Sequence, residues 1–97
     1  VDVYHVWSDP DLASQILRVG NRIIAFHVFD WLVPTIDLVN DRGMPGDGVI
    51  NIPPIRRPVE TVGFNGAIAL EIFSPYWWQK DINSTLDISV DRIAHYC

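Results

Sequence analysis

The sequence predicts an α/β chain in which parallel strands alternate with helices. Three short runs, at Val1–Trp7, Arg22–Phe29 and Ala67–Phe73, are rich in the β-branched and aromatic residues that favour strands. Each run is followed by a segment that carries helical signals. A β-α-β-α-β-α order implies a parallel sheet with right-handed crossovers, because successive buried strands are then joined by helices that cover the sheet.

The first strand and helix are predicted from composition and from capping residues. Val1–Trp7 reads as a strand that is already under way at the first residue. Asp9 can cap the next helix and Pro10 suits its first position, while Gly20 is a natural stop. Apolar residues between these signals recur at helical spacing: Leu12, Ala13, Ile16 and Leu17. Because a domain rarely begins inside a core strand, we expect either a fragment or a partner that covers this strand.

The second unit is longer and contains an extended connection. Arg22–Phe29 is a nearly continuous apolar run, as is typical of a strand buried on both faces. Asp30–Ile50 holds three glycines and two prolines, and loops of that length in compact domains are often functional. A helix is predicted within Ile52–Val62, where Pro58 removes one backbone donor. Phe64–Gly66 then signals a turn.

The third unit consists of the Ala67–Phe73 strand and a helix predicted over Ile82–His95. Four apolar residues are expected to form the buried stripe of that helix: Ile82, Leu86, Val90 and Ile93. Three β/α units are too few to close a barrel. In isolation they would leave strand edges and one face of the sheet poorly covered.

Composition excludes several classes of function. The 97 residues suffice for one small domain, and a hydrophobic fraction of 48% is typical of a globular protein. A net charge of −5 gives no basic surface for nucleic acid or an anionic membrane. We find no apolar stretch of about 18 residues that would span a bilayer. Cys97 is the only cysteine, so no intrachain disulfide can form, and a reducing cytoplasmic location is expected.

Polar residues interrupt each predicted strand. The first strand carries Asp2 and His5, the second His27 and the third Glu71. Ligands of parallel α/β folds bind at the carboxyl ends of the strands, where these side chains could converge. Carboxylate, imidazole and a second carboxylate suit one divalent ion, namely Mn²⁺, Mg²⁺, Co²⁺ or Zn²⁺. Taken singly, each of these residues could instead be a core residue whose polar group is hydrogen-bonded, without any role in metal binding.

Four segments resemble, in order and at compatible spacing, motifs of the xylose isomerase-like TIM-barrel family of sugar phosphate isomerases and epimerases. Asp2–His5 looks like the Asp-x-x-His strand motif, and Ile24–Asp30 looks like the following metal-histidine strand. Asp41–Gly48 resembles the loop before the next helix, and Leu70–Ser74 the final strand with its catalytic glutamate. By this resemblance residues 1–97 form the C-terminal part of such a domain: a partial (β/α)₈ TIM barrel, strands six to eight.

The resemblance also implies roles for these residues. Asp2, His27 and Glu71 would bind one divalent metal ion, Glu71 would also be catalytic, and His5 would contact a hydroxyl or carbonyl of the substrate. The implied function is isomerisation or epimerisation of a sugar or sugar phosphate by proton transfer through a metal-stabilised enediolate. A fourth ligand and a second catalytic glutamate would lie in the missing N-terminal part of the barrel. That part is the expected partner, and the fragment alone is expected to be inactive.

Further residues are candidates for substrate binding. Trp7, Trp31 and the Trp77–Trp78 pair follow predicted strand ends, where they could wall a sugar pocket. Rim packing or a subunit contact is the alternative, and a homo-oligomer is left open. Arg42 and the Gly46–Gly48 turn could hold a phosphate, although such a turn is often only a turn. Three acidic residues are expected to be solvated or capping: Asp30, Asp37 and Asp47.

Three other functions are left open. Apurinic endonucleases of the endonuclease-four type share this barrel, but their loop carries Asp-Arg-His where this chain has Asp41–Gly43. The acidic charge also argues against a DNA substrate. An inosose dehydratase uses the same barrel and metal, and the residues do not distinguish it. A truncated, non-catalytic module is the third alternative.

Overall fold

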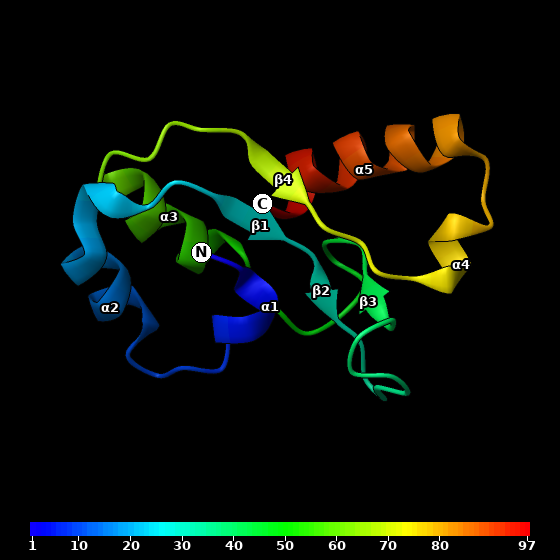
Figure 1. The fold of residues 1–97 in the computed structure, drawn as a ribbon, viewed down its shortest axis with the longest axis horizontal. Helices are drawn as coiled ribbons and strands as arrows, with labels where there is room; N and C mark the ends of the chain where they lie inside the picture. Colours follow the sequence, from blue (N-terminus) through cyan, green and yellow to red (C-terminus); the bar gives the residue numbers. More distant parts are fainter.

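A computed structural model describes residues 1–97 and contains the predicted parallel strands (Figure 1). Strand β1 (Phe26–Val28) pairs in parallel with β4 (Ile68–Leu70), and His27 lies opposite Ala69. Asp2 forms an isolated parallel bridge with the same His27. Three segments that are distant in sequence therefore run side by side in one direction, with β1 in the middle.

The prediction of a strand over Val1–Trp7 is wrong beyond Asp2. Helix α1 (Val3–Val6) begins immediately after it, because Asp2 Oδ1 accepts a hydrogen bond of 3.0 Å from the amide of Tyr4. This is the geometry of an N-terminal helix cap, which satisfies an amide that has no partner within the helix. Asp2 is therefore both the last paired residue of the extended segment and the cap of the helix.

Helix α2 (Leu12–Val19) begins later than Asp9 and Pro10 predict. Asp11 occupies the capping position, and the side chain of Asp9 instead accepts a hydrogen bond of 2.8 Å from the Asp11 amide. The predicted stop is confirmed, because Gly20 ends the helix at a φ of +64°. A single 3₁₀ turn, η1 (Gly20–Arg22), follows.

Both remaining strands are shorter than the apolar runs that predict them. The run Arg22–Phe29 contains only β1, in which Phe26 and Val28 are buried. The run Ala67–Phe73 contains only β4, whose residues are partly or fully exposed. A strand forms where a neighbour supplies hydrogen bonds, and β4 has a neighbour along one edge alone. The outer edge of β4 is therefore uncovered within this chain.

The connection Asp30–Ile50 is organised by a fully buried carboxylate. It contains an antiparallel pair, β2 (Asp30–Trp31) and β3 (Arg42–Gly43). Asp30 accepts four hydrogen bonds of 2.8–3.0 Å from backbone amides: those of Trp31, Gly46, Gly48 and Ile50. Of the two predicted alternatives for Asp30, solvated or capping, the structure excludes the solvated one, because four backbone amides replace its water. Gly48 has no room for a side chain, since a Cβ there would lie 2.7 Å from Asp30 Oδ1.

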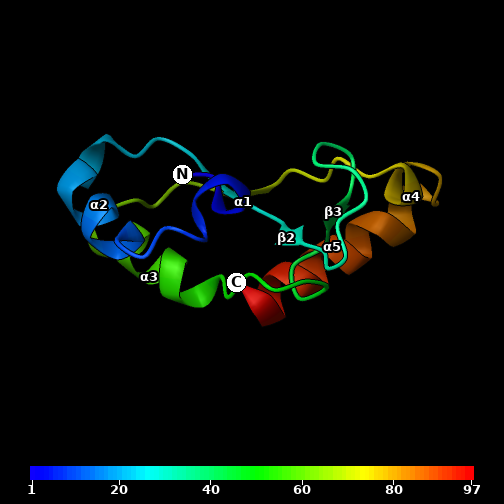
Figure 2. The same cartoon turned by 90° about the horizontal axis from the view of Figure 1, so that it is seen from below.

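Helix α3 (Pro53–Thr61) confirms the helix predicted within Ile52–Val62, and Pro58 is accommodated inside it. The core joins α1, α2, β1 and α3, and its buried side chains form one cluster: Val3, Tyr4, Ile16, Phe26, Val28, Phe29, Ile50, Ile52, Ile55 and Val59. Seen from below, α2 and α3 occupy one end of the molecule and α5 the other (Figure 2).

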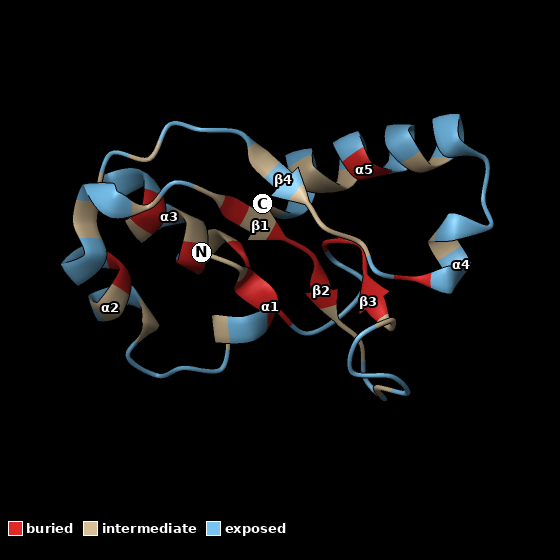
Figure 3. Cartoon of the chain, in the orientation of Figure 1, coloured by how far each residue is buried: buried red, intermediate tan, exposed pale blue.

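A short helix, α4 (Pro75–Trp78), precedes α5 (Ile82–Tyr96), which confirms the last predicted helix. The predicted buried stripe is wrong: Ile82, Leu86 and Val90 are 79%, 61% and 63% exposed. The buried residue of α5 is Ser89, and most of the helix faces solvent (Figure 3). These three side chains are therefore largely uncovered within these 97 residues, whereas Ile93, the fourth residue of the predicted stripe, is half-buried and packs against the core. No helix of the structure is both long and apolar enough to cross a membrane.

Candidate metal centre

Three candidate ligands meet at the carboxyl ends of the parallel segments. Asp2 ends the first segment, His27 lies within β1, and Glu71 directly follows β4. Since His27 pairs with Ala69 and side chains alternate along a strand, Glu71 projects to the same face as His27. The bridge between Asp2 and His27 adds the second carboxylate. The pairing register therefore brings the three predicted side chains together.

The separations between these side chains fit a shared cation. His27 Nδ1 lies 4.0 Å from Asp2 Oδ2 and 4.0 Å from Glu71 Oε1, and one ligand atom from each residue lies within 4.8 Å of the others. These distances are too long for direct hydrogen bonds. Ligand atoms around one ion at about 2.1 Å are separated by roughly 3–4 Å. The two separations of 4.0 Å are at the upper end of that range and the outer limit of 4.8 Å exceeds it, so the three side chains would have to move slightly closer to share one ion. The donor types suit a divalent ion, and the ligand roles themselves stay predictions.

Arg42 pairs with the third ligand. Its guanidinium donates a hydrogen bond of 3.0 Å to Glu71 Oε2, and only 8% of the Arg42 side chain is exposed. Three aromatic rings surround the guanidinium carbon at 4.5–4.8 Å: those of Tyr4, Phe29 and Phe73. Burial raises the pKa of Tyr4 although the nearby Arg42 charge opposes this shift, so the phenol stays neutral. Sequence reasoning did not foresee the ion pair with Glu71.

His5 lies at the exposed edge of the cluster. Its Nε2 atom is 3.9 Å from Asp2 Oδ2, and 62% of its side chain is exposed. One turn of α1 separates His5 from Asp2 and places both on the same side. His5 could therefore reach a molecule bound beside the three ligands, as the sequence predicts.

The tryptophans make packing contacts within the chain. Trp31 packs on Tyr4 with ring centroids 4.7 Å apart, and Trp7 lies 6.3 Å from Trp31. Trp7 also lines a cavity of about 420 Å³ that includes none of the three candidate ligands. Trp78 belongs to α4, donates to the carbonyl of Ile72 and is 59% exposed. The structure thus gives these rings packing contacts, and their contact with a substrate stays a prediction.

The Gly46–Gly48 turn is not a free anion site. The amides of Gly46 and Gly48 both donate to Asp30, and the amide of Asp47 donates to the carbonyl of Met44. Asp47 also forms an ion pair of 2.9 Å with Arg92, so the expectation that it is simply solvated is incomplete. With its amides already bonded, the turn does not support the predicted phosphate contact.

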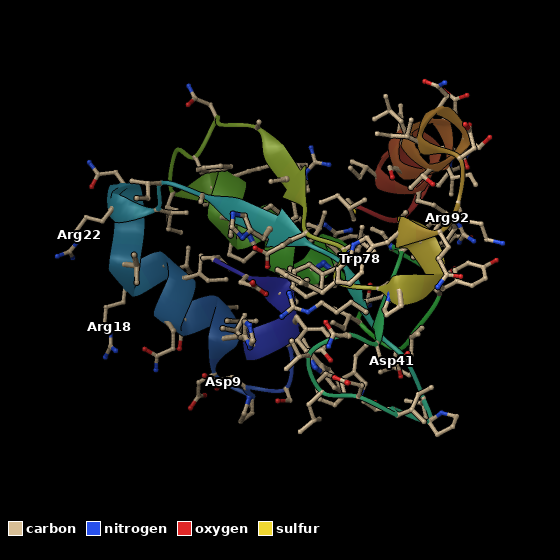
Figure 4. The ribbon with its side chains drawn as sticks, turned by 45° about the vertical axis from the view of Figure 1, so that its right-hand side comes forward. Asp9, Arg18, Arg22, Asp41, Trp78 and Arg92 are labelled. Carbon is tan, nitrogen blue, oxygen red and sulfur yellow. The ribbon has the colours of Figure 1, made fainter.

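Other basic residues lie away from the cluster. Arg18 and Arg22 extend from α2 and the turn after it, outward from the sheet (Figure 4). The only cysteine, Cys97, is a poor metal ligand near neutral pH, because burial raises its pKa to about 11 and keeps the thiol protonated. Neither group contributes to the candidate centre.

Residues 1–90 match the family described as xylose isomerase-like TIM barrel. The chain belongs to this family. A solved structure, that of protein SMc04130 from Sinorhizobium meliloti 1021, is 52% identical, with a TM-score of 0.94 over 99% of this chain. The match covers 36% of that protein, so the chain spans about a third of its length. No curated protein matches.

The xylose isomerase-like family is mostly enzymatic, is often metal-dependent and includes sugar isomerases and epimerases. This chain is an α/β fragment of such a barrel, with a parallel strand pair flanked by helices. The Asp2–His27–Glu71 cluster lies at the strand ends, where active sites of TIM barrels are built.

Proposed function

We propose that this chain forms the last three β/α units, strands six to eight, of a metal-dependent sugar or sugar phosphate isomerase or epimerase. The whole of residues 1–97 would be the C-terminal part of one barrel domain. The observation that carries the proposal is the convergence of Asp2, His27 and Glu71 from three neighbouring parallel segments, within 4.8 Å of one another. Two carboxylates and one imidazole are ligands of Mn²⁺, Mg²⁺, Co²⁺ and Zn²⁺.

Each residue would have a distinct task. A bound divalent ion supplies Lewis acidity to the oxygens of a substrate that carries a hydroxyl beside a carbonyl. Glu71 would accept the proton from the carbon that bears the hydroxyl, next to the carbonyl, as a carboxylate positioned as general base. His5, at the open edge of the cluster, would donate a hydrogen bond to a substrate oxygen. Return of the proton to a different carbon gives isomerisation, and return to the opposite face gives epimerisation.

The proposal is tested with the parent barrel, meaning the complete protein that contains this chain. Metal analysis of the purified protein should find about one divalent ion per barrel, as one cluster of this kind predicts. The loaded protein is then assayed with keto-sugars, sugar phosphates and inososes. Isomerised or epimerised sugar supports the proposal, and dehydration of an inosose supports the lyase of the same family. Absence of both metal and turnover would contradict it.

The exposed apolar residues support a second part of the proposal, that the rest of the barrel covers this chain. Only 17 of 97 residues are buried, and the stripe of α5 formed by Ile82, Leu86 and Val90 is more than half exposed. A row of exposed apolar side chains on one helix is typical of a surface that packs against another element or chain. The S. meliloti relative has residues that could cover this surface, because the match covers only 36% of its chain and the remainder has no counterpart here.

We therefore expect the isolated chain to self-associate and to be rescued by the remainder of a barrel. The chain is expressed alone and together with the unmatched portion of the S. meliloti relative, as two polypeptides. A one-to-one complex on size-exclusion chromatography is expected for the pair, and aggregates for the chain alone. Leu86→Glu should weaken the complex, whereas Asp87→Asn, at the next position of the same helix, should not. A stable, monodisperse monomer would contradict this prediction.

A further inference from the structure

We infer that Arg42 is a positioning residue for Glu71: it holds Oε2 of the carboxylate and leaves Oε1 as the oxygen that faces the ion. This inference rests on the proposed metal site and adds to it a function for the one buried cation beside the cluster. The two residues are 29 positions apart in sequence, and their side chains meet at 3.0 Å.

The two oxygens of Glu71 have different surroundings. Oε2 accepts the hydrogen bond from Arg42, whereas Oε1 lies 4.0 Å from His27 Nδ1 on the side of the cluster. A free carboxylate can bind an ion through both oxygens. With Oε2 held by a charged donor, Glu71 is directed toward binding through one. Oε2 accepts more than one hydrogen bond, so it can still receive a proton.

The position of Arg42 is fixed from several directions. Its amide donates a hydrogen bond of 3.2 Å to the carbonyl of Phe73, two residues beyond Glu71. Its guanidinium lies among three aromatic rings, with the ring centroids 4.5–4.8 Å from its central carbon. Nε of Arg42 is buried without a hydrogen-bond partner. Burial of an incompletely satisfied guanidinium is unfavourable for folding, which points to a function beyond stability.

The buried carboxylate of Asp30 extends this arrangement into the loop. Trp31 pairs with Arg42 in the β2–β3 ribbon, and Asp30 bonds the amides that follow Arg42 along the chain, including those of Gly46 and Gly48. The β2–β3 ribbon and the hydrogen bonds to Asp30 therefore hold the backbone from which Arg42 reaches Glu71. Sites supported in this way keep their geometry when a ligand binds.

Whether loss of the Arg42 side chain strengthens or weakens metal binding distinguishes a positioning role from simple structural support. A guanidinium next to the ligand repels a divalent ion, so its removal should tighten binding, whereas general damage to the site would weaken it. Mn²⁺ is titrated into the parent barrel by calorimetry. Arg42→Met should bind Mn²⁺ about tenfold more tightly or better, because a neighbouring positive charge has been removed. Arg42→Lys keeps the charge and should bind within about threefold of the original.

The control is Arg56→Met, which breaks another Arg–Glu pair, between Arg56 and Glu60 on α3, and should leave Mn²⁺ affinity unchanged. Crystals of the Mn²⁺-loaded proteins give the second measurement. Glu71 is expected to bind through Oε1 alone in the original protein and through both oxygens in Arg42→Met. Should the methionine variant fail to fold, Arg42→Gln, which is also neutral, carries the same expectation for Mn²⁺ affinity.

The outcomes distinguish the two proposals. Unchanged or weaker Mn²⁺ binding in the neutral variants, with normal binding by the original protein, overturns the role of Arg42 alone. Two-oxygen binding by Glu71 in the original protein overturns it as well. Failure of the original protein to bind Mn²⁺ overturns the proposed metal site, and the role of Arg42 with it.

Discussion

Replacement of Glu71 by Gln in the parent barrel should abolish metal-dependent isomerisation and weaken Mn²⁺ binding. The amide has the same shape as the carboxylate, but it carries no charge for the ion and cannot take up a proton. Loss of a general base costs about 10²–10⁴-fold in rate. Mutation of a residue that only hydrogen-bonds a metal ligand typically lowers metal affinity by roughly 10- to 100-fold, so loss of a direct ligand should lower it further. His27→Ala should lose Mn²⁺ binding to a similar extent.

Matched variants separate these effects from general damage. Glu60→Gln alters a glutamate on α3 that pairs with Arg56, away from the cluster. His95→Ala alters a histidine that is 67% exposed and pairs with Asp91 on α5. Both should keep normal rates and normal Mn²⁺ affinity. Near-normal rates in Glu71→Gln or His27→Ala would show that the assigned roles are wrong.

Asp30→Ala should cause the largest loss of stability among single substitutions in this chain. The carboxylate is fully buried and accepts four backbone hydrogen bonds, which alanine cannot replace. Each buried amide left without a partner costs about 1–3 kcal/mol, and water can reach some of them after the loop relaxes. We expect the free energy of unfolding of the parent barrel to fall by about 3 kcal/mol or more. Urea denaturation followed by circular dichroism measures it.

The control for Asp30 lies in the same loop. Asp37 also accepts two backbone hydrogen bonds, from the amides of Val39 and Asn40, and these bonds lower the pKa of its carboxyl group. Asp37 is exposed, however, so water can replace the lost bonds, and Asp37→Asn should have little effect. If Asp30→Ala unfolds at the same urea concentration as the original, the four hydrogen bonds do not stabilise the loop.

Much of the fold follows from local signals in the sequence. Parallel strands at Phe26–Val28 and Ile68–Leu70 and the helix Pro53–Thr61 lie within predicted segments, and the helix Ile82–Tyr96 extends one residue beyond its predicted end. Glycine at position 20 ends a helix as its conformational freedom predicts. These features depend on residue type and spacing within about one turn or one strand, which a sequence displays directly.

The errors arise where a distant partner overrides local preference. Val3–Val6 is rich in residues that favour strands, yet it is helical, with Asp2 capping its first turn. The apolar stripe of α5 has helical spacing, but what would bury it is not among these residues. Local pattern predicts an amphipathic helix, whereas only the neighbouring elements decide which face is covered.

By itself, the sequence determined the chemistry of the centre: two carboxylates and an imidazole, one on each of three successive units of a parallel fold. The tertiary structure alone decided how they are held. The pairing of His27 with both Asp2 and Ala69 brings the candidate ligands together, Arg42 reaches Glu71 across 29 positions, and Asp30 is buried among amides up to 20 positions away. Contacts over such separations depend on chain closure and burial, which leave no periodic signal in the sequence.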